Sequence, residues 1–324
     1  KAGGAIFPLE TNYPPELLAE LAEMAGIDIV LTIEEMKGML PTELRTDDHS
    51  ICLEGEWYAT LQGADLPELR DPGVCLADPA YVTMTSGSTG RPKGIINAHI
   101  GATCNFLARF DLVPYHEGER EALNVFFVWE CLRPLLKGAT AYIIPDDVIF
   151  DPKRLANFIH EHCITRLMTT TQLLEAILEY PGLNVASRLD SIRYWYLEGE
   201  PVPARVVNKW LAELGDGHGL YNVYSTWESL DCSYAHLNQE ILTSKFAPIG
   251  LPIKNVTVYL MTGEDDSRQI APLGSPGEIY VDSPGLALSY LGDPVKTAEK
   301  FLTVDVTVNG KAKTLRLCLL RHRK

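Results

Sequence analysis

Two kinds of apolar pattern alternate through the middle of the chain. Short apolar runs of strand length alternate with longer segments in which apolar positions recur every three to four residues. The short runs predict buried strands and the longer segments predict amphipathic helices. In chain order these are a helix at 151–162, a strand at 165–168, a helix at 172–179, a strand at 192–197, a helix at 204–214 and a strand at 220–224. Strands joined by such helices form right-handed βαβ units, so we expect a mainly parallel sheet with helices on both faces.

The flanking segments continue this pattern on one side and change it on the other. Before residue 151 we expect helices from Glu16, at 101–109 and at 129–136, and strands at 28–32, 81–84 and 141–145. Beyond residue 249 two strands, 256–261 and 278–281, flank a turn-rich segment, which is typical of an antiparallel arrangement. The predicted fold class is α/β, with layered, mainly parallel sheets flanked by helices and a smaller antiparallel β unit near the C-terminus. We divide the chain into an α/β core at 1–248, a β-rich subdomain at 249–317 and a divergent tail at 318–324.

Composition limits the partners of the protein. The 324 residues, 46% of them hydrophobic, are enough to bury a large core. Forty-three acidic residues against 28 basic ones give a formal net charge of −15, which argues against nucleic acid or an anionic membrane as the main partner. The seven cysteines are scattered without a CxxC pair, as expected of reduced thiols. With no apolar run of transmembrane length and no leader, we expect a cytoplasmic protein.

The segment from Tyr81 to Gly94, YVTMTSGSTGRPKG, combines the most chemistry with the least side-chain bulk. An apolar strand leads into a loop of hydroxyl residues and glycines, where positive φ angles bring backbone N–H groups close to an anion. Ser86, Ser88 and Thr89 add O–H donors, and Lys93 adds a positive charge. The segment therefore predicts a phosphate-binding loop.

This loop differs from a P-loop, in which the lysine lies on the first turn of a helix and precedes a hydroxyl residue. Here Lys93 is followed by Gly94, and Pro92 disfavours helical geometry in the residue before it. We therefore expect Lys93 on an extended segment beyond the turn. The alternative is a Ser/Gly-rich linker, which the apolar segments on both sides of the loop argue against.

The TSGSTGRPKG segment resembles the signature loop of the adenylate-forming superfamily, which includes acyl-CoA synthetases, luciferases and peptide-synthetase adenylation domains. Five other segments resemble further motifs of that family in the family's order: a lysine-to-helix segment at 1–18, a substrate-pocket segment at 128–139, a Gly-Glu turn at 197–201, an Asn-x-Tyr motif at 222–228 and a Gly-Glu-Leu and Gly-Tyr-Leu segment at 277–291. The resemblance covers nearly the whole chain. Within the family, the chain looks most like reductase-linked and other nonribosomal-peptide-synthetase-like enzymes.

The resemblance implies a site for ATP. The residues that it assigns to ATP are Thr85, Ser86, Gly87, Ser88, Thr89, Gly90, Lys93, Gly199, Glu200, Asn222 and Tyr224. The loop and Lys93 would hold the phosphates, the turn around Glu200 would lie against the base, and Tyr224 would offer a face on which adenine stacks. Glu228 would supply a carboxylate oxygen for Mg²⁺, and Lys93 and Glu228 are the expected catalytic residues. Taken alone, Tyr224 is equally compatible with a core aromatic residue and Glu228 with a solvated acid.

Two segments depart from the family pattern. Trp227 stands where the family usually has a threonine that reaches the α-phosphate, and Thr226 or Ser229 is the candidate replacement. After residue 317 the family continues into Tyr-Arg-Thr-Gly-Asp and a C-terminal subdomain with the catalytic lysine, whereas this chain ends in CLLRHRK. We therefore expect a piece of a longer adenylation domain, weakly active or inactive alone. A retained intron or a shifted reading frame are candidate origins of the tail.

The same alignment assigns a substrate pocket to Val125, Phe126, Trp129, Met168, Tyr196, Glu198, Val223, Asp231 and Cys232. Family members that activate α-amino acids carry an aspartate at the position of Val125, where it binds the α-ammonium group, so a free α-amino acid is disfavoured. Aromatic faces together with Glu198 and Asp231 suit a cation. This favours a carboxylate whose positive charge lies away from the α position, such as a β- or ω-amino acid or a betaine. If the two acids point elsewhere, the pocket suits an apolar or aryl acid.

The activity that the resemblance implies is ATP-dependent activation of a small carboxylic or amino acid. The product would be an acyl adenylate, formed with release of pyrophosphate and then transferred to the phosphopantetheine thiol of a partner carrier domain. Two alternatives remain open on the sequence. One is a ligase that transfers the acyl group to CoA, and the other is a fragment that binds nucleotide without turnover.

Overall fold

The computed structural model describes residues 3–11, 13–46, 48–55, 72–85, 92–124, 128–238, 244–263, 268–308 and 311–320. The chain forms two compact units, which we describe separately. The first comprises Lys1–His99 and Ala287–Glu299, and the second comprises Ile100–Leu286 and Lys300–Lys324. The boundary expected at residue 248 stays a prediction, whereas these compact units divide after His99 and assign Ala287–Glu299 to the first unit.

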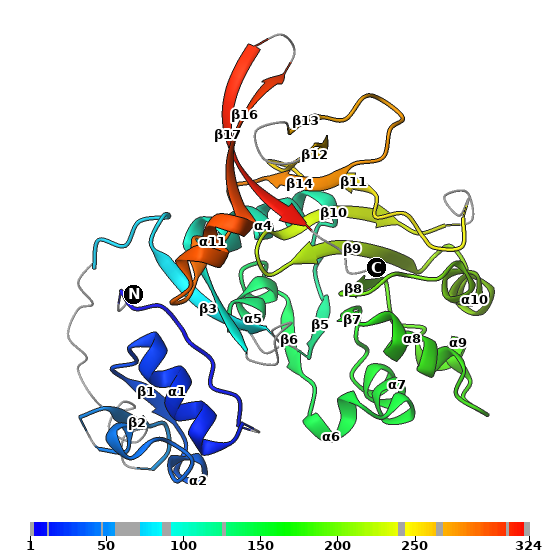
Figure 1. Ribbon diagram of the computed structural model, residues 1–324. Helices are drawn as coiled ribbons and strands as arrows, with labels where there is room; N and C mark the ends of the chain where they lie inside the picture. Colours follow the sequence, from blue (N-terminus) through cyan, green and yellow to red (C-terminus); the bar gives the residue numbers. More distant parts are fainter. Residues whose placement is uncertain are drawn as a thin grey trace. The chain divides into compact units, whose positions relative to one another are not determined.

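The first unit contains two small sheets (Figure 1). Its elements are α1 (Pro15–Ala25), β1 (Val30–Thr32), α2 (Glu34–Lys37), η1 (Thr42–Leu44), β2 (Ser50–Cys52), β3 (Pro79–Thr85), β4 (Lys93–Ala98), β15 (Ser289–Tyr290) and α11 (Pro294–Lys300). Strands β15, β4 and β3 form an antiparallel sheet, while β1 and β2 pair parallel. The helix predicted from Glu16 and the strands predicted at 28–32 and 81–84 are confirmed. Lys93 begins β4, as expected of a lysine on an extended segment.

The second unit is built on a seven-stranded sheet in the order β11-β10-β9-β8-β7-β5-β6. Neighbouring strands are parallel from β9 to β6, and β10 and β11 are antiparallel. The elements are α4 (His99–Leu112), β5 (Arg120–Leu123), α5 (Val128–Leu135), β6 (Thr140–Ile143), α6 (Asp146–Ile149), α7 (Pro152–Glu161), β7 (Arg166–Thr169), α8 (Thr171–Leu178), α9 (Val185–Arg188), β8 (Tyr194–Glu198), α10 (Ala204–Leu214), β9 (Gly219–Thr226), β10 (Leu230–His236) and β11 (Leu251–Pro252). The predicted mainly parallel sheet is confirmed.

The two faces of this sheet differ in chemistry because side chains alternate along each strand. On one face Trp195, Leu167 and Leu220 pack against helices α7 to α10, and the rings of Trp195 and Trp210 meet edge to face at 5.5 Å. This face forms the main apolar core. On the other face Tyr196 and Val223 pack against Ala108 of α4 and against Val113. Helices therefore cover both faces, as the sequence predicts, but the second face carries tyrosines and charges.

A five-stranded antiparallel sheet follows in the second unit, in the order β13-β12-β14-β17-β16. Its strands are β12 (Thr257–Thr262), β13 (Gln269–Ile270), β14 (Glu278–Asp282), β16 (Phe301–Val308) and β17 (Lys311–Leu320). The antiparallel unit predicted near the C-terminus is thus present. The first residues of the expected divergent tail, Cys318, Leu319 and Leu320, end β17 and pair with β14. Residues 321–324 lie outside the described part of the chain.

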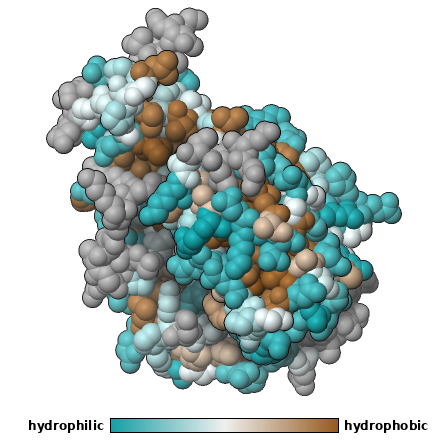
Figure 2. Space-filling model, turned by 90° about the vertical axis from the view of Figure 1, so that its right-hand side faces the viewer, coloured by the Kyte–Doolittle hydropathy of each residue, from teal (hydrophilic) through white to brown (hydrophobic). Residues whose placement is uncertain are grey.

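The described surface is largely hydrophilic on the face shown in Figure 2, where apolar residues lie in separate groups. None of the helices in the described ranges combines the length and the apolar character that crossing a membrane requires. Of the helices that cover the apolar face of the large sheet, α7, α8 and α9 each begin with a side-chain cap, whereas α10 begins after Pro203 without one. Asp151 accepts hydrogen bonds from the backbone N–H groups of Lys153 and Arg154 at the start of α7, and Pro152 occupies the first helical position as predicted.

One glycine is required by the contact between the loop before β11 and strand β10. Gly250 has a φ of 82°, and a Cβ atom there would lie 1.9 Å from the carbonyl oxygen of Tyr234. We predict that Gly250→Ala lowers the free energy of unfolding by at least about 2 kcal/mol, because both the backbone conformation and the contact oppose a side chain. Gly217→Ala is the control, since nothing lies within 4 Å of its Cβ position. Urea unfolding of both variants checks this, and equal stabilities would contradict it.

Candidate functional site

Five predicted pocket residues lie on four neighbouring strands of the large sheet. Met168 lies on β7, Tyr196 and Glu198 on β8, Val223 on β9 and Asp231 on β10. Met168 is paired in register with Tyr196, and Glu198 with Val223. The cluster to which Tyr196, Val223 and Met168 belong is the one packed against α4, which puts them on the tyrosine-rich face. The structure therefore brings these five residues together on neighbouring strands, and their role in binding a substrate stays a prediction.

The sequence analysis assigned a substrate cation to Asp231, but in the structure Asp231 binds residues of the protein itself. Its Oδ2 accepts from Arg109 Nε at 2.5 Å and its Oδ1 from Arg109 Nη2 at 3.0 Å. The hydroxyl of Tyr234 also donates to Oδ2, at 2.5 Å. Burial alone would raise the pKa of Asp231, but the Arg109 guanidinium and these donors lower it. Asp231 is thus an ionised carboxylate with both oxygens already engaged.

The pKa of Glu198 is shifted in the opposite direction from that of Asp231. It is half-buried at the end of β8, and its hydrogen bond comes from the neutral hydroxyl of Ser225. The pKa of Glu198 is raised to about 7, chiefly because the group is removed from water and next because Asp231 carries a nearby negative charge, while Arg109 and the Ser225 hydrogen bond lower it in part. A carboxyl group with such a pKa is ready to gain from a positive charge placed beside it.

A β-bulge lets Asp231 and Tyr234 reach the same face of β10. Asp231 is paired with Ser225 and Tyr234 with Val223, so the four residues from Asp231 to Tyr234 lie opposite three residues on β9. Cys232 is the extra residue. Its thiol hydrogen-bonds with Ser229 at 3.1 Å, and burial raises the pKa of the thiol to about 12. Cys232, expected to line the pocket, therefore belongs to the bulge.

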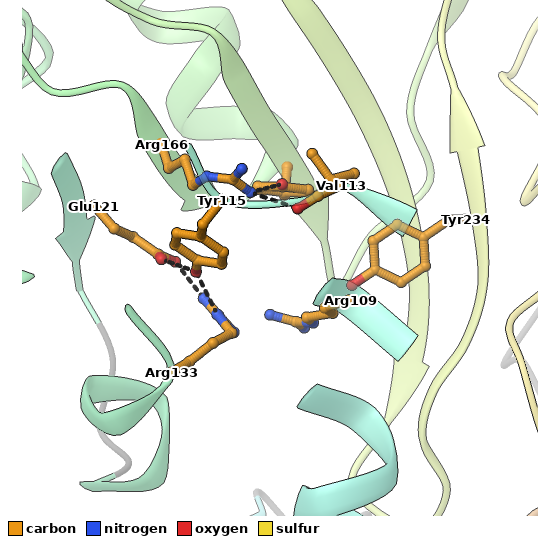
Figure 3. Close-up of a pocket in the computed structure, with 8 residues that line it drawn as sticks. Arg109, Val113, Tyr115, Glu121, Arg133, Arg166 and Tyr234 are labelled. Atoms are coloured by element: carbon orange, nitrogen blue, oxygen red, sulfur yellow. Dashed lines mark hydrogen bonds and ion pairs between the residues drawn. The ribbon is translucent and has the colours of Figure 1, made fainter. Parts of the chain in front are cut away.

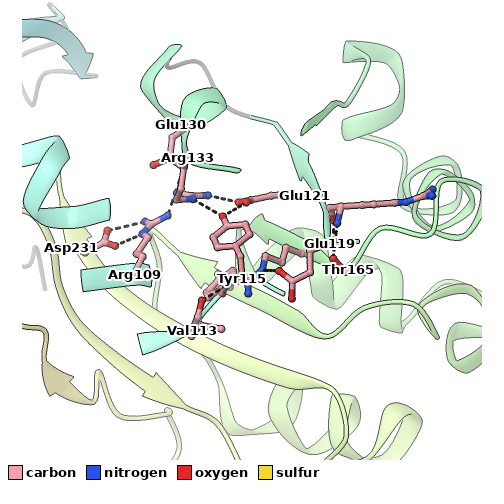
Figure 4. A network of polar contacts seen from close by, with 12 residues as sticks. Arg109, Val113, Tyr115, Glu119, Glu121, Glu130, Arg133, Thr165 and Asp231 are labelled. Carbon is pink, nitrogen blue, oxygen red and sulfur yellow. Dashed lines mark hydrogen bonds and ion pairs between the residues drawn. The ribbon is translucent and has the colours of Figure 1, made fainter. Parts of the chain in front are cut away.

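Further charged groups lie next to the Arg109–Asp231 ion pair (Figures 3 and 4). Glu130 on α5 lies 3.6 Å from Arg109 and also binds Arg133, which in turn binds Glu121 on β5. The hydroxyl of Tyr115 donates to Glu121. A cavity of about 10 Å³, room for about one water molecule, lies among Arg109, Arg133 and the tyrosines. We call Arg109, Glu130, Arg133, Glu121 and Asp231 the charge chain.

Arg166 on β7 fixes a pocket tyrosine. Its guanidinium lies 4.0 Å from the ring centre of Tyr115 and 4.2 Å from that of Tyr194. Its Nη1 donates to the hydroxyl of Tyr196 at 2.9 Å, and its Nε is paired with Glu119. Two aromatic faces and a carboxylate therefore hold a buried cation, which sets the orientation of the Tyr196 phenol.

The residues assigned to adenosine have structural partners of their own in the second unit. Gly199 turns the chain after β8 with a φ of 88°. Glu200 Oε1 accepts from the backbone N–H of Gln172 at 2.8 Å, and the amide of Asn222 donates to the carbonyl of Pro248 at 2.9 Å. Tyr224 is 8% exposed. These contacts hold the turn after β8 and the strand β9 in place.

Glu228 lies in the turn between β9 and β10 and is a reasonable fit for one ligand of Mg²⁺. Its side chain is 18% exposed, so it can be reached from solvent, and Lys300 Nζ lies 3.9 Å from its Oε1. Mg²⁺ commonly takes one or two protein carboxylates and completes its shell with phosphate oxygens and water. Within the described ranges, no group of three or more His, Cys, Asp or Glu side chains is placed to hold a metal ion. The hydroxyls of Thr226 and Ser229, the candidate replacements for the missing threonine, bind each other at 2.8 Å.

The predicted phosphate loop lies in the part of the sequence assigned to the first unit. Of its residues, the structure describes only those at the two ends. Thr85 ends β3 and is paired with Lys93 at the start of β4. The expectations for Ser86, Gly87, Ser88, Thr89 and Gly90 lie outside the described residues, as do those for Val125 and Phe126. Trp129 lies on α5, but its side chain is outside the described part.

Sequence reasoning missed Arg109, Arg166 and Tyr234. Arg166 had a signal, because it is a charged residue within an otherwise apolar strand. Arg109 stood in a predicted helix, where a charge is normally read as solvated. Tyr234 was missed because β10, with the sequence LDCSYAH, was not predicted as a strand.

Comparisons with known proteins place the chain among nucleotide-dependent enzymes. A family model described as AMP-binding enzyme matches residues 1–291. Glycine betaine reductase ATRR of Emericella nidulans is 32% identical over 307 residues, covering 93% of this chain and 23% of that protein. Tyrocidine synthase 3 of Brevibacillus parabrevis is 30% identical over 314 residues, covering 93% of this chain and 4% of that protein. The crystal structure of the nonribosomal peptide synthetase FmoA3 superposes with a TM-score of 0.81 at 26% identity, covering 98% of this chain and 33% of that one. The chain thus spans less than a quarter of these two curated relatives.

The raised pKa of Glu198 predicts a pH dependence of stability. Between its ordinary value of 4.5 and about 7, the folded protein keeps a proton that the unfolded chain loses. The stabilising contribution is therefore complete below 4.5 and is lost as the pH rises through 7, by on the order of 1 to 3 kcal/mol. We expect wild type to lose stability relative to Glu198→Gln between pH 5 and pH 8 in urea unfolding. Glu200→Gln, which removes a nearby carboxylate, is the control. If the difference in free energy of unfolding between wild type and Glu198→Gln is the same at every pH, the prediction is contradicted.

Proposed function

The chain belongs to the AMP-binding enzyme family, and from that premise we propose that it activates a carboxylic acid with ATP. A carboxylate oxygen of the substrate would attack the α-phosphorus of ATP, forming the acyl–phosphate bond as the bond to pyrophosphate breaks. The products are an acyl adenylate and pyrophosphate. The observation that carries this proposal is the family match over residues 1–291, which includes the whole TSGSTGRPKG segment.

We assign the chain's residues to roles in this reaction. Lys93 and the loop before it would bind the phosphates, and Tyr224 with the turn at Gly199 and Glu200 would hold the adenosine. Such groups act mainly by positioning and by charge neutralisation. Glu228 would hold Mg²⁺, which would supply positive charge to neutralise the phosphates. Lys300 is the counter-ion of Glu228 in this structure. When Mg²⁺ binds, Lys300 must share the Glu228 carboxylate with the metal or release it.

We further propose that the acyl group passes to the phosphopantetheine thiol of a carrier domain in the cytoplasm. The thiolate would attack the acyl carbonyl and release AMP, leaving a thioester. Support comes from two relatives, tyrocidine synthase 3 and the nonribosomal peptide synthetase FmoA3. Transfer to free CoA is the alternative, and the two differ in whether a carrier protein or CoA accepts the acyl group in an assay.

For the substrate we propose a carboxylic acid whose cationic nitrogen lies away from the usual α-ammonium position. Glu198 supports this, because it is a pocket carboxylate with a neutral hydrogen-bond donor and no ion-pair partner among the described residues. Tyr196 lies on the same strand and face, where an aromatic ring adds a cation–π contact worth about 2 kcal/mol when desolvated. The relative named glycine betaine reductase suggests a quaternary ammonium acid as the first compound to test.

The nucleotide proposal predicts that Lys93→Ala weakens MgATP binding about 10- to 100-fold, the usual effect of losing one charged hydrogen bond. Isothermal titration calorimetry with this chain measures it directly. Lys153→Ala, which removes an exposed lysine from α7, should bind as wild type does. Equal affinities for wild type and Lys93→Ala would remove Lys93 from the nucleotide site.

The substrate proposal predicts the order of acids in ATP–pyrophosphate exchange, measured on the gene product that contains this chain. Glycine betaine and ω-amino acids should exchange fastest, at least about tenfold above neutral α-amino, aryl and hydroxy acids, which corresponds to 1.4 kcal/mol in the transition state. Preference for an aryl or a neutral α-amino acid would contradict the cationic substrate while leaving adenylation intact. Absence of exchange with every acid would contradict adenylation itself.

A further inference from the structure

We propose that Arg109 is a specificity-determining residue, which takes Asp231 as its own counter-ion and so leaves Glu198 as the carboxylate for the substrate's cation. This inference rests on the proposed cationic substrate. Sequence reasoning offered Glu198 and Asp231 as equivalent partners for a cation. The structure makes them unequal, and the difference originates in a helix residue outside the predicted pocket.

Arg109 saturates Asp231 geometrically. The guanidinium extends from the last turn of α4 to β10, where Nε and Nη2 address the two carboxylate oxygens separately. Figure 4 shows this two-pronged contact. A bidentate pair of this kind is strong and directional. Because Tyr234 also donates to Oδ2, a ligand cation at Asp231 would have to compete with a guanidinium and a phenol.

Arg109 is itself held from the other side. Its Nη1 lies 3.6 Å from Glu130, whose carboxylate also binds Arg133 on the same helix. The Arg109 side chain is 10% exposed, so it has little room to adopt another rotamer outside the charge chain. Its position is therefore fixed by α4, by α5 and by β10 together. An arginine fixed in this way stays with Asp231 when a ligand arrives.

Glu198 gains more from a cation than Asp231 does. Asp231 has a full positive charge beside it, whereas the hydrogen bond of Glu198 comes from the uncharged Ser225 hydroxyl. A substrate cation next to Glu198 would neutralise a carboxylate that the neighbouring Asp231 charge repels. The same cation next to Asp231 would have to compete with Arg109 for both carboxylate oxygens. Arg109 thereby limits the site to one cationic group and fixes where it binds.

The test uses variants in which either Glu198 or Asp231 is the carboxylate that can bind a cationic ligand. The probes are glycine betaine and 3,3-dimethylbutanoate, which have nearly the same shape but differ in the positive charge. The measured quantity is the ratio of their dissociation constants, from titration calorimetry with this chain. In wild type we expect betaine to bind at least about tenfold more tightly, equal to 1.4 kcal/mol. Glu198→Gln should bring the ratio close to one.

The decisive variant is Arg109→Met with Glu198→Gln, which frees Asp231 while Glu198 is neutral. It should restore a preference for betaine of at least about fivefold, and its net charge equals that of wild type. A purely structural role for Arg109 gives no such recovery. A ratio that stays near one in the folded double variant therefore overturns the proposal.

Two further variants keep the test decisive if that protein does not fold. Arg109→Met with Asp231→Asn removes both charges of the pair and should keep the wild-type ratio, because Glu198 is intact. Loss of the ratio in that variant also overturns the proposal. Asp111→Asn, which removes an exposed charge two residues along α4 that pairs with Lys254, is the matched control. A wild-type ratio near one would instead contradict the cationic substrate, and with it the role of Arg109.

Discussion

The second unit depends on balancing charges beneath one face of its large sheet. Arg133 and Arg166 are buried, and Arg109 is nearly so, on a face where most domains place aliphatic side chains. Removing such ions from water costs several kcal/mol each unless partners are well placed, and breaking one pair exposes the other partner to that cost. Each guanidinium accordingly has a carboxylate, and the carboxylates come from α5, β5, β10 and the segment before β5. The ion pairs thus tie together elements that the backbone hydrogen bonds of the sheet do not connect.

This arrangement explains why the residues of the predicted pocket are held in place although few of them belong to the main apolar core. The main core lies on the opposite face, between the sheet and helices α7 to α10. On the pocket face, Arg166 orients Tyr196 and Arg109 orients Asp231, so the polar atoms are positioned by ions. A preorganised polar lining is what recognition of a charged ligand requires.

The fold was largely predictable from the sequence, because the alternation of two apolar periods is strong between residues 151 and 224. The strand β10 was missed, since its sequence LDCSYAH mixes polar residues with a bulge and shows neither period. For the site, spacing from family motifs located Glu198 and Asp231. It gave no information on ion pairing, because Arg109 is 122 residues away from Asp231 in sequence. Contacts of that range follow from topology, which single-residue patterns do not encode.

The bulge at Cys232 has a consequence for comparing pockets between related proteins. In a regular strand, residues an even number apart share a face, whereas here Asp231 and Tyr234 do so at a separation of three. Counting positions along this strand by twos would assign Ser233 to the pocket and Tyr234 to the far side. A relative that lacks the inserted residue places a different set of side chains on this face of the strand, even if the rest of its sequence is identical. Gap placement at one position therefore decides which amino acids are compared as ligand contacts.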